Sequence, residues 1–577
     1  MNRSRTGLFY WIWFLLGFSA TAFAQQMNVL FIAVDDLKPN LGAYGDLLVQ
    51  SPNIDLLAEA GTTFLNNHCQ QAICSPSRAS LLTGWRPDRT GVWTLETIIR
   101  DINPDVVTLP QYFRQNGYQT AGLGKVFDSR TVDAQFDSLS WSVPFINVIG
   151  NRWIDSENRT SNQSGDVADD FLIDGMITNE SITLLDQLAA ENSPFFLAVG
   201  FRKPHLPFVA PQRYWDLYER SDFELPRFQE QAVGSPNFGY PLASELRGYD
   251  DIPDEGGIAM EKQLELIHAY YACTSYIDAQ VGALMNHLET LGIRDNTIVV
   301  LWGDHGWHLG DHDLWGKSTN YEQATRSPLV ISVPGQHANQ KSNSPTELVD
   351  LFPTLCDLTG LPIPENLAGK SLLPILQDAG ASVKDFAVSQ YPRIFRGEPI
   401  DGYALRTERY RYVEWLGDFK STMPYNPEDV RARELYDYEV DPLETVNLID
   451  SAAYQNIAMD LQNKLIEFFA SQAVPVGIAD IGTVPDDFHL LQNYPNPFNP
   501  VTNIGFRISE FGFLSLKIYD AAGKLVKTLV SENYSPGVYN IQWDSLNDAG
   551  QKVASGIYFA AMQFKLETRS RKMLLIR

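Results

Sequence analysis

Short apolar runs that alternate with amphipathic segments constrain the fold of this chain more than any other feature. Runs of this kind lie at residues 29–34, 195–200, 297–302 and 329–333, and they lack the polar alternation of a half-exposed strand. Strands that are apolar throughout are buried on both faces, as in parallel sheets covered by helices. Helical periodicity lies between them, at residues 52–60, 109–115, 182–188 and 260–291. The pattern predicts an α/β fold with a mostly parallel sheet.

Two regions with different patterns follow this α/β part. Residues 348–359 are one more amphipathic helix, residues 403–415 are typical of hairpin strands, and residues 458–471 of a closing helix. We therefore expect a main domain at residues 27–365 and a smaller α+β subdomain at residues 366–476. After a linker at residues 477–485, alternating strands are expected at residues 502–508, 514–520, 537–543 and 556–563. Their spacing predicts a small all-β sandwich at residues 486–577.

Residues 1–24 have the pattern of an export signal. Arg3 and Arg5 precede an apolar run at residues 8–18, and the sequence Ala22-Phe23-Ala24 fits a small-residue cleavage site. An uncleaved membrane anchor is the alternative, although the run is short for a spanning helix. No later stretch approaches 18 consecutive apolar residues. We expect a protein exported through the inner membrane, secreted or attached to the cell surface, and without stable membrane insertion.

Charge and cysteine content exclude some classes of protein. Acidic residues outnumber basic ones by 70 to 44, so the net charge is −26. A chain of this charge repels nucleic acid, and an anionic substrate would need a local cluster of cations or a metal ion. Four cysteines in 577 residues are too few for a disulfide framework. One or two bridges are the most that they could form.

Charged side chains gather where the predicted strands end. In an open parallel sheet, ligands bind beyond the carboxyl ends of the strands. The residues at four such ends are Asp35, Asp36, Lys125, Lys203, His205, Asp304 and His305. A helix cap or a turn is the alternative explanation for each pair taken alone. Their joint occurrence favours a site for a hard divalent cation, and calcium is the natural choice outside the cell.

The segment Cys74-Ser75-Pro76-Ser77-Arg78 is expected to open a helix that Gly84 ends. Cys74 would then lie at a helix N-terminus, where the dipole and the free N–H groups favour an anion. An ordinary metal ligand or a small buried residue is the alternative for a cysteine at this position.

The run CSPSRASLLTG resembles the signature of the type I sulfatases, which is C-x-P-S-R followed by small residues and T-G. The resemblance extends from residue 28 to about residue 450 and is closest to the iduronate-2-sulfatase branch. The stretches VDDLKPNLGAYGD, FFLAVGFRKPHLPF and DHGWHLGDHDLWGKSTNYE are similar to that branch in order and spacing. The resemblance implies an alkaline-phosphatase-like sulfatase core. It also implies hydrolysis of O-sulfate esters on a sulfated glycan that contains uronic acid.

A modified nucleophile and one metal ion are further implications of the resemblance. A separate formylglycine-generating enzyme would oxidise Cys74 to formylglycine, and the hydrated aldehyde would attack the sulfate ester. Collapse of its second hydroxyl would then expel sulfate, which a serine could not do. One Ca²⁺ would be held by an oxygen of residue 74 together with Asp35, Asp36, Asp304 and His305.

The resemblance assigns roles to the remaining site residues as well. Arg78 would orient the hydrated aldehyde, and His205 would protonate the leaving alcohol. Three lysines would surround the sulfate oxygens and offset charge in the transition state, namely Lys125, Lys203 and Lys317.

One position departs from the family pattern. Asp128 stands where the family usually has a histidine, three residues after the lysine of the Gly-Lys pair. Another group, such as His308 or His312, could take over the role of that histidine. The alternatives are that Asp128 points away from the site or that it contacts the substrate.

Two other functions stay open at this point. A phosphodiesterase or phosphonate hydrolase of the same superfamily is one, although phosphatase relatives normally have Ser or Thr at the position of Cys74. A non-catalytic, surface-exposed glycan-binding protein is the other, with Asp128 as its only support.

The end of the chain carries a resemblance of its own. The run LQNYPNPFNP at residues 491–500 and the tripeptide Gly556-Ile557-Tyr558 are similar to the sorting domain of proteins exported by the type IX secretion system. This resemblance implies that the secretion machinery is a partner. A carbohydrate-binding β-sandwich is the alternative.

Overall fold

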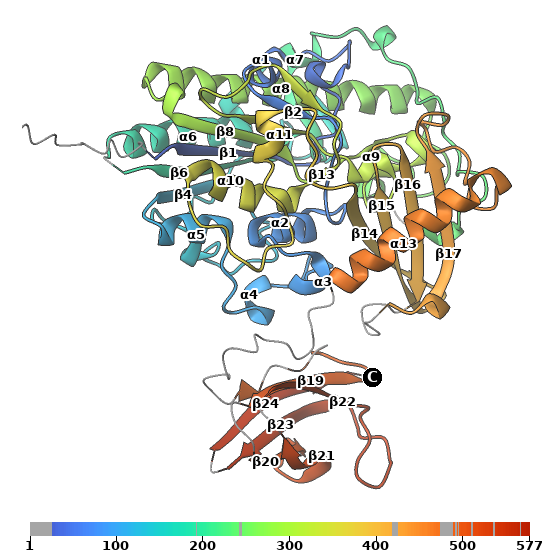
Figure 1. Ribbon diagram of the computed structural model, residues 1–577. Coiled ribbons are helices and arrows are strands. Elements are labelled where there is room, and N and C mark those ends of the chain that lie inside the picture. Colours follow the sequence, from blue (N-terminus) through green and yellow to red (C-terminus); the bar gives the residue numbers. More distant parts are fainter. Residues whose placement is uncertain are drawn as a thin grey trace, which may run out of the picture.

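The computed structural model describes residues 26–191, 193–241, 245–417, 425–472, 489–490, 493, 496–508, 512–534, 537–565 and 567–576. The predicted signal at residues 1–24 and the linker at residues 477–485 lie outside them. A seven-stranded sheet has the order β12-β2-β11-β8-β1-β6-β4 (Figure 1). In chain order its strands are β1 (Asn28–Val34), β2 (Thr62–Phe64), β4 (Gln119–Gly124), β6 (Phe195–Phe201), β8 (Thr297–Gly303), β11 (Leu329–Ser332) and β12 (Gln340–Ser342).

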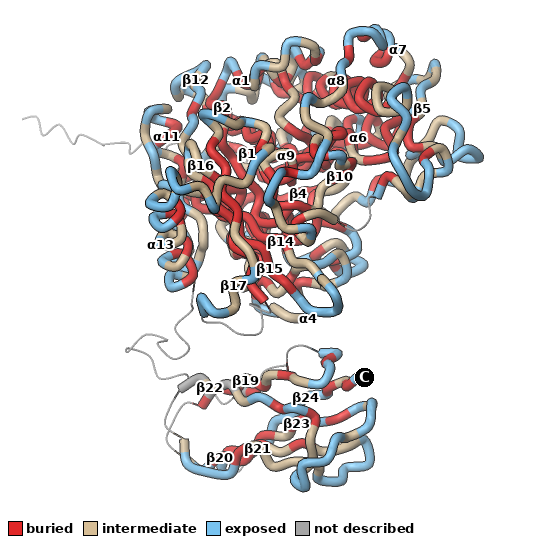
Figure 2. Tube along the Cα trace, turned by 90° about the vertical axis from the view of Figure 1, so that its right-hand side faces the viewer, coloured by how far each residue is buried: buried red, intermediate tan, exposed pale blue. Residues whose placement is uncertain are grey.

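The central strand β1 explains why these runs are apolar at every position. Strand β1 pairs in parallel with β6 on one side and β8 on the other. Its residues Leu30 and Ile32 belong to one hydrophobic core, while Val29 and Phe31 belong to a second core on the opposite face of the sheet. Figure 2 shows the inner strands buried along their length. Both faces of the sheet are covered, as the sequence predicted.

Helices cover the two faces of the sheet. One core contains residues of α1 (Pro52–Glu59), α6 (Ile173–Ala189) and α8 (Met260–Thr290). The other contains residues of α2 (Cys74–Thr83), α5 (Leu109–Gln115) and α10 (Leu351–Thr359). The two sets lie above and below the sheet in Figure 1. This three-layer arrangement confirms the α/β class and leaves the strand ends free to form a site.

Two details differ from the sequence prediction. Strand β11 runs antiparallel to β8, so the sheet is mixed on that side, because β11 follows β8 through a connection that contains no long crossover helix. Helix α6 begins at Ile173, well before residue 182. Polar residues such as Asp174 and Asn179 obscure the helical periodicity of its first turns, although Asp174 is buried.

The smaller subdomain contains a four-stranded antiparallel sheet and one long helix. The sheet has the order β14-β15-β16-β17, with the edge strands β14 (Ala387–Phe395) and β17 (Val430–Asp437). The predicted hairpin corresponds to β15 (Glu398–Arg406) and β16 (Tyr410–Gly417). Helix α13 (Gln455–Gln472) packs on it through Leu461 and Leu465, which share a core with Leu405. The α+β prediction for this region is confirmed.

The C-terminal region is a β-sandwich. Its two sheets have the orders β18-β19-β22 and β21-β20-β23-β24 and enclose one core. The first sheet consists of β18 (His489–Leu490), β19 (Thr502–Ile508) and β22 (Gly537–Trp543), and the inner strands of the second are β20 (Gly512–Asp520) and β23 (Gly556–Phe564). The sequence prediction missed the two strands at the edges of the second sheet, β21 (Leu525–Tyr534) and β24 (Glu567–Leu575). Strand β24 carries exposed Arg569 and Arg571, because charged side chains protect a sheet edge from further pairing, and such a strand lacks the usual apolar signal.

The cysteines are unpaired and the described helices are too short or too polar to span a membrane. All four cysteines are free thiols in the structure. Among the described residues, no helix has both the length and the apolar character that crossing a membrane requires.

Candidate active site

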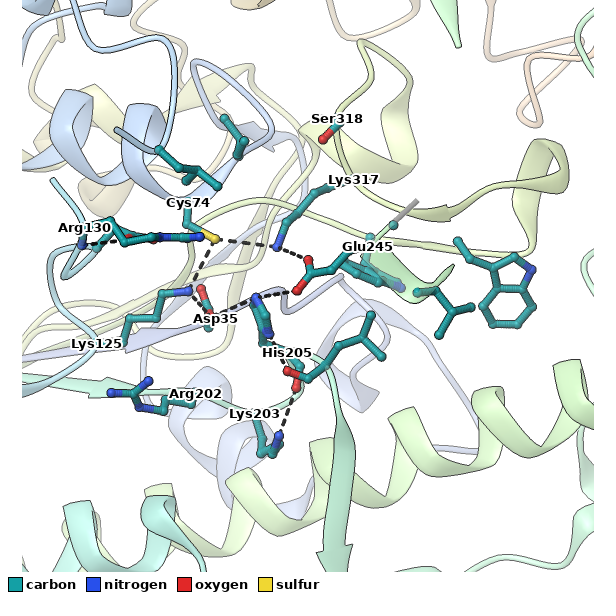
Figure 3. A pocket seen from close by; sticks show the side chains of 18 of the residues that line it. Asp35, Cys74, Lys125, Arg130, Arg202, Lys203, His205, Glu245, Lys317 and Ser318 are labelled. Atoms are coloured by element: carbon teal, nitrogen blue, oxygen red, sulfur yellow. Dashed lines mark hydrogen bonds and ion pairs between the residues drawn. The ribbon is translucent and has the colours of Figure 1, made fainter. Parts of the chain in front are cut away.

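The carboxyl ends of four adjacent strands meet at one edge of the central sheet. The strands lie in the order β8-β1-β6-β4 and run parallel. The residues that follow them are Asp304 and His305 after β8, Asp35 and Asp36 after β1, Lys203 and His205 after β6, and Lys125 after β4. Figure 3 shows Asp35, Lys125, Lys203 and His205 around one pocket. The structure thus brings together the strand ends that the sequence singled out.

Cys74 is the first residue of helix α2 and lies beside this edge. A proline occupies the first turn, where its missing N–H is tolerated, and Gly84 ends the helix with a φ of 65°. Cys74 is 1% exposed. Its Sγ lies 3.4 Å from Lys125 Nζ and 3.6 Å from Lys317 Nζ. A helix N-terminus and two ammonium groups therefore converge on this atom, which is an environment suited to an anion.

Acidic and imidazole side chains surround the same sulfur atom. Two overlapping groups, each with its potential ligand atoms within 4.8 Å of one another, consist of Asp36, Cys74, Asp304 and His305 and of Asp35, Asp36, Cys74 and His205. Carboxylate oxygens are the ligands that hard cations such as Ca²⁺ prefer. Three carboxylates gathered in a buried site also repel one another unless positive charge is present.

His305 tests whether a cation fits this group. Its Nδ1 lies 3.0 Å from the Gly306 carbonyl oxygen, which can only accept, so Nδ1 carries the proton. Burial lowers the pKa of His305, so the ring is neutral and Nε2 holds a lone pair. Within the described part of the chain this buried Nε2 has no hydrogen-bond partner, and it faces Asp36 Oδ1 at 3.5 Å and Asp304 Oδ2 at 3.6 Å. Three acceptor atoms therefore face one another without a donor between them. A metal ion bound by these three atoms would remove this repulsion, so the residues present fit a metal ion.

Arg78 connects the helix to both acidic strand ends. Its Nη2 donates to Asp35 Oδ1 and its Nε to Asp304 Oδ2, each at 2.9 Å, and all three side chains are buried. Its Nη1 donates to the carbonyl oxygens of Lys125 and Val126. Burial alone would lower the pKa of Arg78, but Asp304 and Asp35 raise it above its ordinary value. The guanidinium fixes the start of α2 against β1, β4 and β8, because a buried charge is stable only with such partners.

The charge states of the two aspartates after β1 differ. Burial would raise the pKa of Asp35, but Lys125 and Arg78 hold it well below its ordinary value. Burial raises the pKa of Asp36 to about 6, although Lys317 Nζ lies 2.7 Å from Asp36 Oδ1. Asp36 therefore lacks the full compensation that Asp35 receives, and a further cation next to it would favour its ionised form.

His205 and Lys203 come from the same loop but face different partners. His205 Nδ1 donates to the Leu206 carbonyl oxygen at 2.6 Å, and its Nε2 lies 4.0 Å from Asp35 Oδ2. Burial lowers the pKa of His205 to about 4. Lys203 Nζ instead donates to the carbonyl oxygens of His205 and Pro207, and burial lowers its pKa to about 8. The structure thus directs His205 toward the carboxylates and the Lys203 ammonium toward the backbone of its own loop.

The sequence analysis missed several residues of this site. A cavity of about 860 Å³ beside Cys74 is lined in part by Glu245, Arg130, Arg202 and Trp307. Glu245, in the 3₁₀ turn η6 (Glu245–Gly248), lies 3.5 Å from His205 Nε2 and 3.7 Å from Lys317 Nζ. No sequence pattern marks this glutamate, because it belongs to an irregular loop far from any strand end.

The side chain of Asp128 pairs with a neighbouring arginine and not with either of the two histidines considered above. Its carboxylate binds the guanidinium of Arg130, and both residues line the cavity. His308 Nε2 lies 3.0 Å from Thr319 Oγ1, and the His312 ring stacks on Tyr321 with centroids 4.4 Å apart. Neither histidine lies in the cavity wall, so neither takes the position of the family histidine.

Family models match most of the chain. The sulfatase model matches residues 27–361, which is more than half of the sequence. The model of the C-terminal part of N-sulphoglucosamine sulphohydrolase matches residues 310–471, and the FlgD Ig-like domain model matches residues 502–567. The chain belongs to the sulfatase family. It is accordingly a sulfuric ester hydrolase, as the sequence analysis predicted.

Individual relatives agree with this assignment. The chain is 34% identical over 515 residues to the iduronate 2-sulfatase of Homo sapiens, an alignment that covers 75% of this chain and 93% of the relative. A protein solved with its substrate D-glucosamine-2-N,6-O-disulfate shares the fold, with a TM-score of 0.63, 24% identity and coverage of 78% and 98%. The phosphonate monoester hydrolase of Agrobacterium radiobacter also has a TM-score of 0.63, with 22% identity and the same coverage. The predicted alkaline-phosphatase-like sulfatase fold is confirmed.

Proposed function

We propose that this sulfatase hydrolyses O-sulfate esters of a glycan that contains uronic acid, with a formylglycine made from Cys74 as nucleophile and one bound Ca²⁺. One observation carries the proposal. The Cys74 sulfur lies at the start of a buried helix, in contact with two ammonium groups and within 4.8 Å of the ligand atoms of Asp36, Asp304 and His305. Nucleophile, sulfate-binding cations and metal ligands would then meet at a single point.

The protonation of the thiol supports a modified nucleophile. Burial raises the pKa of Cys74 well above its ordinary value, with a further contribution from Asp35, even though Lys125 and Lys317 act in the opposite direction. An unmodified thiol here stays protonated at neutral pH and is a weak nucleophile. Formylglycine, once hydrated, supplies hydroxyl groups in its place.

The metal ligands in this proposal are the residues predicted from sequence. Asp35, Asp36, Asp304 and His305 would hold the ion together with an oxygen of residue 74. A bound Ca²⁺ supplies positive charge that lowers the pKa of a coordinated hydroxyl and neutralises sulfate charge. Arg78 would orient residue 74, since it already fixes the two carboxylates on either side of it.

The remaining residues would bind the sulfate and move a proton. Lys125 and Lys317 would hold sulfate oxygens, because both ammonium groups already contact the Cys74 sulfur. His205 would protonate the leaving alcohol. Burial lowers its pKa to about 4 even though the nearby Glu245 carboxylate already favours the imidazolium, so the charge of the bound sulfate must favour it further. Lys203 would act through His205, since its ammonium holds the backbone of that loop.

The glycan part of the proposal is supported by the relatives and by the cavity. The aligned human relative is named for a sulfated uronate, and about three quarters of this chain aligns with it. A cavity of about 860 Å³ is large enough for more than one sugar ring.

A substrate screen tests the proposed function. Aldehyde-bearing enzyme should hydrolyse 4-nitrophenyl sulfate and should remove sulfate from at least one member of a panel of defined sulfated oligosaccharides that contain uronic acid. Sulfate release is measured by ion chromatography. Turnover of phosphonate or phosphate diesters with no turnover of any sulfate ester would refute the proposal and favour the phosphonate hydrolase alternative.

We further propose that the C-terminal β-sandwich directs secretion or surface attachment through the type IX machinery. The support is the run LQNYPNPFNP, which lies between the strands β18 and β19 of the sandwich, together with the predicted signal at residues 1–24. A chain that ends at residue 476 should accumulate inside the cell envelope of a host with this system, while the full chain reaches the surface or the medium. Fractionation followed by immunoblotting measures this, and equal export of both chains would contradict the proposal.

A further inference from the structure

Asp128 and Arg130 form a fixed pair in the wall of the cavity. Arg130 Nε donates to Asp128 Oδ1 at 2.9 Å and Nη2 donates to Oδ2 at 2.7 Å. The Asp128 side chain is 2% exposed and that of Arg130 is 53% exposed. This two-point contact fixes the plane of the guanidinium. Among the described residues, Nη1 has no hydrogen-bond partner, so one edge of a charged, oriented group stays available.

The loop that carries this pair is bonded to the start of helix α2. Ser75 Oγ donates to Thr131 Oγ1 at 2.8 Å, and Thr131 N and Oγ1 contact the Asp128 carbonyl oxygen at 3.0 and 3.1 Å. Ser75 directly follows Cys74. The position of the guanidinium is therefore coupled through a short chain of hydrogen bonds to the position of the proposed nucleophile.

Arg130 occupies a different position from the two lysines at the sulfur. Lys125 and Lys317 each donate to Cys74 Sγ, whereas the described residues show no hydrogen bond between Arg130 and Cys74, although both line the cavity. The hydrogen bonds that Arg130 donates to Asp128 raise the pKa of Arg130, and the charge of Glu245 acts in the same direction, so Arg130 is charged. When the lysines hold one anionic group of a ligand at residue 74, Arg130 can bind a second anionic group of the same ligand.

We propose that Arg130, oriented by Asp128, binds a second anionic group of the substrate, separate from the sulfate ester that is cleaved. This group is a carboxylate or a second sulfate on the same sugar or the next one, both of which the planar guanidinium can recognise through paired N–H groups. Asp128 is then a positioning residue. The inference rests on the proposed function, and it gives Asp128, which stands where the sequence analysis expected a histidine, a role in substrate recognition.

Two pairs of substrates test the proposal. The first pair is the methyl glycoside of a 2-O-sulfated hexuronate and its carboxyl-reduced hexose, and the second is glucosamine bearing N- and 6-O-sulfate and N-acetylglucosamine 6-O-sulfate. In Arg130→Gln the ratio of kcat/KM between the doubly and the singly charged member should fall about tenfold, mostly through KM. A fall in the first pair identifies a carboxylate, and a fall in the second identifies a sulfate. An unchanged ratio in both pairs overturns the proposal.

Matched variants separate recognition from folding. Arg213 is as exposed as Arg130 and forms an ion pair with Asp169 outside the cavity, so Arg213→Gln should keep the wild-type ratio. Asp128→Asn should lower the ratio less than Arg130→Gln, and the double variant should equal Arg130→Gln alone, because Asp128 acts through Arg130. Fully additive effects would contradict the positioning role.

A binding measurement keeps this inference distinct from the proposed function. In a Cys74→Ser background, calorimetric Kd values for the doubly charged sugars should rise about tenfold when Arg130→Gln is added. If no sulfate ester is turned over by aldehyde-bearing enzyme, the proposed function fails while this comparison still decides the role of Arg130. Equal Kd values for Cys74→Ser and for Cys74→Ser with Arg130→Gln would reject the proposed role of Arg130.

Discussion

Replacing Cys74 by serine should lower kcat for sulfate esters by at least about 10⁴-fold, the scale seen when an enzyme loses its nucleophile. Serine is close to cysteine in size, so the start of α2 and the contacts of Lys125 and Lys317 should persist. A serine sulfate has no second hydroxyl that can collapse and release sulfate, so any sulfate that reaches it stays bound. Steady-state kinetics and a thermal melt of the same preparation measure activity and folding separately.

Cys69 provides the matched control for this variant. It is a buried thiol five residues earlier in the chain, and among the described residues its sulfur has one hydrogen-bond partner, a backbone carbonyl oxygen. Cys69→Ser should keep kcat within a few-fold of wild type. Peptide mass spectrometry of active enzyme from a native-type host should find the aldehyde at residue 74 and an ordinary cysteine at residue 69. Active enzyme with only unmodified cysteine at residue 74 would contradict the proposed nucleophile.

Removing divalent metal should lower both activity and stability. Dialysis against a calcium chelator should reduce kcat/KM by at least about 100-fold, and added Ca²⁺ should restore it, because buried carboxylates would then face the sulfate without compensation. The Tm of the Cys74→Ser protein should also rise with added Ca²⁺. Ligand at 100 times its Kd stabilises a folded protein by about 2.7 kcal/mol. This second readout does not depend on the aldehyde.

Asp36→Asn is the most selective variant for the metal prediction. Asp36 has a φ of 57°, a conformation that asparagine also adopts readily, so the backbone should not change. The variant should lose most activity and most of the Ca²⁺-dependent rise in Tm. Asp254 lines the cavity outside the two ligand groups, and Asp254→Asn should behave like wild type. A Tm that neither chelator nor Ca²⁺ changes would reject the metal site.

The strand-end residues could be predicted from sequence because parallel strands share one carboxyl edge. Four adjacent strands run parallel, so the residues after β1, β4, β6 and β8 had to meet. Cys74 could be placed at a helix start because proline and glycine mark the two ends of α2. These inferences used only local signals and one topological rule.

Other features depend on contacts that local signals do not record. The direction of the Lys203 ammonium is set by the carbonyl oxygens that its own loop presents, not by its place after a strand. Glu245 reaches the site from an irregular loop. Sequence alone does not distinguish Arg130 from other exposed arginines, because its orientation depends on its ion pair with the buried Asp128. The antiparallel direction of β11 likewise follows from chain connectivity and not from its composition.

The burial of Cys74 determines when this residue can be modified. Cys74 is the first residue of α2, its sulfur is surrounded by Lys125, Lys317 and the ion pairs of Arg78, and only 1% of the residue is accessible. The active site of a modifying enzyme cannot reach a thiol that is buried in this way. The oxidation that we propose therefore belongs to the nascent or still unfolded polypeptide, before it leaves the compartment where the modifying enzyme acts.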